Sequence, residues 1–78
     1  MYKIPLLFSP QPNGGFTVTS ALLPELITEG ETIEEALENV QDALAAVIEA
    51  YEDLGQALPP SLRVEKTDAF YLETLVAI

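Results

Sequence analysis

The stretch that decides the fold is Thr28–Asn39, with the sequence TEGETIEEALEN. It contains the end of a strand, a turn and the start of a helix. Thr32 and Glu35 form a capping box, in which the threonine hydroxyl accepts the Glu35 N–H and the Glu35 carboxylate reaches back to Thr32. Such a start stabilises a helix by about 1 kcal/mol. The helix is therefore predicted to begin directly after Thr32.

An apolar stripe with helical period follows the capping box and predicts a helix over Ile33–Leu54 that buries one face. Gly55 provides the stop signal. The residues of the stripe are Ile33, Ala36, Leu37, Val40, Ala43, Leu44, Val47, Ile48, Tyr51 and Leu54.

Three strand patterns precede this helix. Tyr2–Ser9 alternates with a period of two, although Pro5 cannot donate to a ladder, so we expect an irregularity there. A turn with Asn13, Gly14 and Gly15 leads to a second strand over Phe16–Ser20, and a third fits Glu25–Glu29,. Together these patterns predict an antiparallel meander.

A last strand is predicted over Phe70–Ile78, after an extended connector that contains Pro59 and Pro60,. The predicted fold class is α+β, in the order β-β-β-α-β. A three-stranded antiparallel meander plus the last strand carries one helix on one face, in a single domain spanning residues 1–78. The uncovered face is half apolar and is a candidate contact with another subunit. The residues expected on it are Leu7, Thr17, Thr19, Tyr71 and Leu75.

Composition excludes several classes of function. The net charge of −10, with only three basic residues, argues against direct nucleic-acid binding and favours a basic partner,. Since the chain has no Cys or His, thiol chemistry, nucleophile–histidine pairs and Cys/His zinc sites are excluded,. No membrane span or signal pattern is present, so we expect a cytoplasmic protein. A chain of 78 residues is near the lower limit for a self-sufficient core, which favours a homo-oligomer, a dimer or higher,.

No catalytic, cofactor-binding or metal-binding residues are predicted. A two-metal nuclease needs clustered carboxylates including one on a central strand, and Tyr2–Ser9 has none,. We therefore expect no enzyme activity. Acids around the helix start are the candidate partner-binding residues, although the helix dipole and solvation of the outer face also account for acids there. These candidates are Glu29, Glu31, Glu34, Glu35, Glu38 and Asp42.

In sequence the chain resembles the HicB-type antitoxin family from the first strand to the end of the helix. The resemblance rests on Tyr2–Pro5 (YKIP), on Gly14–Phe16 (GGF) followed by Val18, on Leu23 and Pro24, and above all on Thr28–Asn39. The family's usual Pro-Asp-Leu-Pro-Gly is replaced here by Ala-Leu-Leu-Pro-Glu, which ends at Glu25.

The resemblance implies a partial RNase H-like fold without nuclease activity that inhibits a HicA-type mRNA-cleaving toxin by direct binding. The partner it implies is a small basic protein. Family members often add a C-terminal DNA-binding domain, and we expect this chain to be a short form without one. An alternative from another class is a stand-alone oligomeric binding module with no toxin partner.

Overall fold

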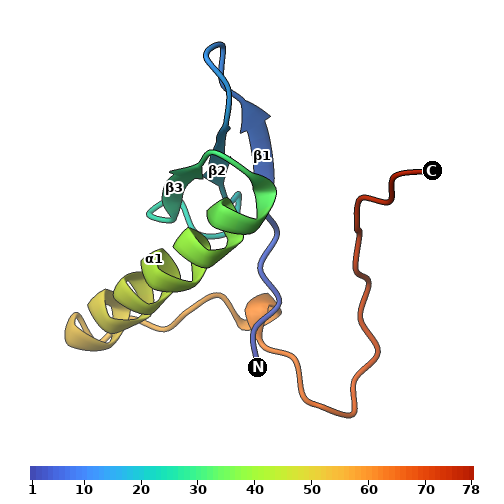
Figure 1. Cartoon of the computed structure of the whole chain (residues 1–78). Coiled ribbons are helices and arrows are strands. Elements are labelled where there is room, and N and C mark those ends of the chain that lie inside the picture. Colours follow the sequence, from blue (N-terminus) through green and yellow to red (C-terminus); the bar gives the residue numbers. More distant parts are fainter.

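The computed structural model describes all 78 residues and contains a three-stranded sheet with one long helix across it (Figure 1). The strands are β1 (Leu7–Pro10), β2 (Phe16–Thr19) and β3 (Ile27–Gly30), paired antiparallel in the order β1-β2-β3. The helix α1 spans Ile33–Asp53, and a short 3₁₀ turn, η1, spans Pro60–Leu62. The predicted α+β class, with a meander followed by a helix, is confirmed.

β1 is shorter than the predicted strand because regular pairing starts only beyond Pro5. Proline lacks an N–H, so the chain before Leu7 does not continue the ladder. Tyr2 forms an isolated antiparallel bridge with Arg63 instead. At the other end of β1, the turn to β2 places Gly14 and Gly15 at φ angles of 96° and 77°. Residues with a side chain rarely adopt this backbone conformation, whereas glycine does so readily.

The helix starts where the sequence predicts. Thr32 has an extended backbone, and its Oγ1 accepts a hydrogen bond from the Glu35 N–H at 3.1 Å. At the other end Leu54 caps α1, and Gly55 follows with a φ of 66°. The stop signal is thus a left-handed glycine directly after the cap, as the sequence predicts.

The core lies between the helix and the covered face of the sheet, and most of the predicted stripe is buried or half-buried. Ala36, Val40 and Val47 are buried, whereas Leu37 is 44% and Leu54 71% exposed. The helix passes close to β3 at Gly30, where a Cβ would lie 2.5 Å from the backbone nitrogen of Ala36. The small pair lets the helix approach the strand closely, and Leu37 is turned outward. The main cluster consists of Val18, Leu23, Leu26, Ala36, Val40, Val47 and Leu62.

The predicted last strand over Phe70–Ile78 does not form. Leu62 and Val64 are buried, but a turn follows in which the Asp68 N–H bonds to the Glu65 carbonyl at 3.0 Å. The chain then runs away from the sheet without helix or strand (Figure 1). Alternation predicts which side chains would share a face of a strand, but it does not provide a partner edge for the backbone.

The uncovered sheet face therefore lacks Tyr71 and Leu75, which belong to the unpaired tail. Its apolar residues are Leu7 and Ile27, both paired with Thr19 across β2 and 63% and 65% exposed. The implied RNase H-like topology stays a prediction. No helix of the structure combines the length and the apolar run needed to cross a membrane.

Candidate functional site

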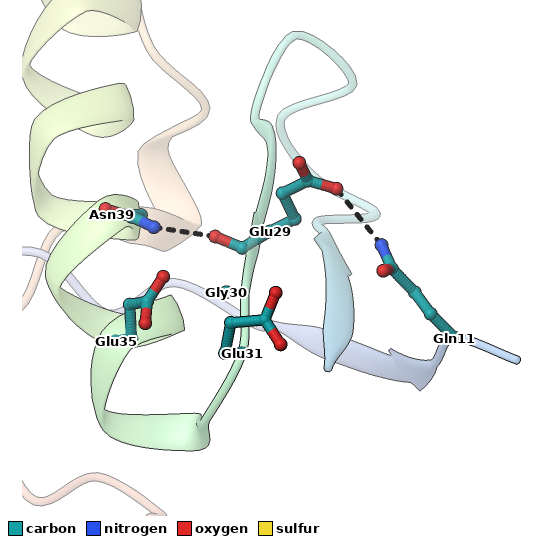
Figure 2. A pocket seen from close by; sticks show the side chains of 6 residues that line it. All are labelled: Gln11, Glu29, Gly30, Glu31, Glu35 and Asn39. Atoms are coloured by element: carbon teal, nitrogen blue, oxygen red, sulfur yellow. Dashed lines mark hydrogen bonds between the residues drawn. The ribbon is translucent and has the colours of Figure 1, made fainter. Parts of the chain in front are cut away.

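Three of the six predicted partner-binding acids meet where β3 passes into α1. Glu29 lies on β3, Glu31 on the following turn and Glu35 on the first turn of the helix. With Gln11 and Asn39 they surround an open hollow of about 190 Å³ that has no apolar lining residue (Figure 2). We call Glu29, Glu31 and Glu35 the hollow acids.

Glu29 is held in place through both its backbone and its side chain. The Asn39 side-chain amide donates a hydrogen bond to the Glu29 carbonyl at 2.7 Å. Gln11 donates to the Glu29 carboxylate at 3.1 Å and to the Thr17 hydroxyl at 2.8 Å. None of the side-chain hydrogen bonds involves the carboxylate of Glu31 or Glu35, so two of the three hollow acids keep free acceptor oxygens.

Two glycines bring these elements together. Gly30 lies against the backbone of Ala36, and a Cβ on Gly15 would lie 2.8 Å from the Gly30 carbonyl oxygen. The hairpin turn, the end of β3 and the start of α1 therefore converge at close backbone contacts. This convergence places Gln11, which is distant in sequence, beside Glu29.

The remaining predicted acids lie outside the hollow on the exposed surface of α1. Glu34, Glu38 and Asp42 are each four residues apart, so they lie along one face of the helix,. We call them the outer acids. All six candidates are exposed, but the structure brings only three of them together around one hollow.

Gln11 and Asn39 are the two members of this site that the sequence did not identify. Asn39 could have been found from the sequence, because it lies one helical turn after Glu35 at the end of the Thr28–Asn39 stretch,. Gln11 had none, because its contact with Glu29 depends on how the hairpin folds toward β3.

A second hollow, of about 220 Å³, lies at the far end of α1 and is lined by Tyr2, Ile48, Tyr51 and Arg63 among others. The Arg63 guanidinium lies 5.9 Å from the centre of the Tyr2 ring. The Tyr51 hydroxyl donates to the Glu25 carboxylate, with oxygen–oxygen distances of 3.1 and 3.2 Å. Burial, followed by the hydrogen bond and the charge of Glu25, raises the pKa of Tyr51 above its ordinary value. Its phenol is therefore held in the neutral form.

The arrangement supports recognition rather than a defined chemical step. No group of three or more Asp, Glu, His or Cys side chains is arranged to hold a metal ion. The hollow acids instead present negative charge next to the amide groups of Gln11 and Asn39. Such a surface complements cationic side chains.

Comparison with known proteins identifies relatives among antitoxins, although no protein-family model matches the chain. Antitoxin HicB of Escherichia coli strain K12 is 32% identical over 68 residues, which are 87% of this chain and 49% of that protein. Antitoxin HicB 1 of Photorhabdus laumondii is 37% identical over 57 residues, 73% of this chain and 37% of that protein. The chain thus spans about half the length, or less, of these relatives. Over the part that it shares with them, the chain belongs to the HicB-type antitoxin family.

Proposed function

We propose that this chain acts in the cytoplasm as the antitoxin of a type II toxin–antitoxin system. It binds a small basic HicA-type toxin directly, prevents that toxin from cleaving mRNA, and catalyses no reaction itself. The observation that carries the proposal is the similarity to two proteins named antitoxin HicB over most of this chain. The hollow acids and the net charge of −10 support a basic partner.

Charge accounts for how such a complex forms. An acidic surface attracts a basic protein over a distance of about a Debye length, roughly 10 Å at 0.1 M salt, and so raises the association rate. Once bound, the antitoxin excludes RNA from the basic surface that would otherwise hold its phosphates. Neither step requires a catalytic side chain on this chain.

The six acids contribute in two ways under this proposal. The hollow acids receive cationic side chains of the toxin, because Glu31 and Glu35 keep unpaired oxygens beside the fixed Glu29. The outer acids extend the negative field along α1. The positive end of the helix dipole lies close to Glu34 and Glu35 and stabilises those two charges in the free chain,.

A binding titration with matched charge variants tests the electrostatic part. The outer-acid variant replaces Glu34, Glu38 and Asp42 by Gln, Gln and Asn. We expect it to weaken binding of a basic HicA-type toxin at low salt by about tenfold or more, and the difference from the parent chain to shrink at high salt.

The control variant removes the same number of charges at the other end of the helix, at Glu49, Glu52 and Asp53. These carboxylates lie near the C-terminus of α1, far along the helix from the hollow (Figure 1). We expect the control to bind nearly as the parent does. Equal loss in both variants would show that only net charge matters, and no loss in either would remove the outer acids from the interface.

A stand-alone oligomeric module is the second candidate, favoured by the exposed Leu7 and Ile27 on the open sheet face. It predicts that the purified chain forms a stable oligomer and captures no basic protein encoded beside it. Capture of such a neighbour, with inhibition of its RNA cleavage, excludes this candidate.

A further inference from the structure

Charge is distributed unevenly along the chain, and the uneven distribution defines a neutral side of the molecule. Residues 4–24, which include β1 and β2, contain no charged side chain, whereas all thirteen acids lie at Glu25 or beyond. The acidic surface described above belongs to the end of β3 and to α1. The β1 side of the sheet therefore suits a neutral, apolar partner rather than a basic protein.

β3 and β1 are the two edges of the sheet, and the β3 edge is partly occupied whereas the β1 edge is open. On β3, the outward Glu29 carbonyl is taken by the Asn39 side chain, and α1 packs along the strand. On β1, the Gln11 N–H bonds to the Gly15 carbonyl, so by antiparallel alternation Ser9 and Leu7 also face β2,. The backbone groups of Leu6 and Phe8 consequently point outward, and no backbone hydrogen bond outside the sheet reaches residues 4–10.

The tail, residues 69–78, has the composition of a strand without a partner. Its side chains are apolar or aromatic except for Glu73 and Thr74, and Glu73 is its only charged side chain. They are open to solvent, with Tyr71 96% and Leu75 83% exposed. A long run of exposed β-forming residues and an unpaired sheet edge in the same chain are the two parts that strand addition needs.

The base of the tail is fixed in a way that directs it outward. The Lys3 N–H bonds to the Leu62 carbonyl at 2.7 Å and the Val64 N–H to the Met1 carbonyl at 3.0 Å, so residues 62–64 run antiparallel to the N-terminus. After the turn at Glu65–Asp68 the tail runs away from the sheet (Figure 1). Its own β1 edge is left empty.

We propose that the tail of one copy adds as a fourth strand to the outer edge of β1 in a second copy, and that the exchange is reciprocal. Each chain provides one apolar strand with a single charged side chain and one neutral edge, so a closed two-fold dimer satisfies both. Two chains of charge −10 repel each other, and this repulsion is weakest when they meet through uncharged surfaces. The β1 side is therefore the favoured side for contact,. Each chain has only ten buried residues, so burying the tail against a second copy adds apolar contact to a small core,.

The test is sedimentation of the chain over a range of concentrations, compared with a variant carrying Leu72→Pro and Leu75→Pro. Both positions are exposed in the single chain, so the substitutions leave its folded part intact, which circular dichroism of the helix verifies. Proline removes the N–H groups that a ladder needs. We expect the parent to be a dimer that dissociates on dilution, and the proline variant to be a monomer at every concentration.

A matched control removes apolar side chains elsewhere, with Leu37→Ser and Leu54→Ser on the exposed side of α1, and should remain a dimer. Amide hydrogen–deuterium exchange shows whether the tail pairs with a second copy or folds back onto β1 of its own chain. Protection of the tail amides that appears only at concentrations where the dimer forms supports the proposal. Tail protection in a monomer overturns it, as does a dimer that persists in the proline variant. Toxin binding is not involved in any of these outcomes.

Discussion

At the scale of single residues, Gly30 has the least freedom to change. Alanine at this position would place its Cβ 2.5 Å from the Ala36 nitrogen and 2.7 Å from the Ala36 Cα, both backbone atoms that cannot move aside independently. We expect Gly30→Ala to destabilise the chain by about 3 kcal/mol, at the upper end of what overpacking costs. Urea unfolding measures this loss.

Gly55→Ala is the control for that substitution. It introduces a side chain into open space at a φ of 66°, so it tests backbone strain without a clash. The expected loss is about 1 kcal/mol. Equal losses for the two variants would contradict the close approach of β3 to α1.

Tyr51 gives a pH-dependent prediction at the same scale. Its pKa is raised in the folded chain by burial first and then by Glu25, so the unfolded chain releases this proton at lower pH than the folded one. The contribution of Tyr51 to stability is therefore complete below its ordinary pKa and declines as pH rises above it.

Glu25→Gln removes the negative charge beside the Tyr51 hydroxyl but leaves the burial of Tyr51 in place. We expect the pKa of Tyr51 to fall in this variant, remaining above the ordinary value, as measured by NMR of the Tyr51 ring during an alkaline titration. An unchanged titration would show that the contact between Tyr51 and Glu25 has no effect on the pKa.

At the scale of elements, the start of α1 is the most predictable feature, because a capping box and a periodic stripe are local signals. The bond from the Glu35 N–H to the Thr32 hydroxyl confirms the N-cap, whereas the predicted return bond from the Glu35 carboxylate to Thr32 does not form. Thr32→Ala should cost about 1 kcal/mol and Thr32→Ser much less, since serine keeps the acceptor. Thermal unfolding compares the two, and equal losses would mean that the hydroxyl is not what matters.

Features that depend on distant contacts could not be predicted from the sequence. Leu37 was expected to face the sheet with the rest of the stripe, but it is 44% exposed where α1 approaches β3 at Gly30 and Ala36. Phe70–Ile78 has the alternation of a strand, yet whether a strand forms depends on an available edge. At the site, the acids of Thr28–Asn39 were predictable as a group, whereas the contact between Gln11 and Glu29 required the folded hairpin.

At the scale of the whole molecule, charge acts on stability and on binding in opposite directions. A chain of charge −10 repels itself when folded, so added salt should raise its melting temperature by screening that repulsion,. The same salt should weaken the proposed complex with a basic toxin. Parallel melting and binding measurements at low and high salt test both effects, and a melting temperature that falls with salt would contradict the account.

The central claim is that this chain inhibits a toxin by covering it. The most direct measurement is RNA cleavage by a small basic HicA-type toxin, with increasing amounts of the chain added. The account predicts that cleavage declines in proportion and stops near equal amounts of the two proteins. Cleavage that continues unchanged in an excess of the correctly folded chain would contradict it.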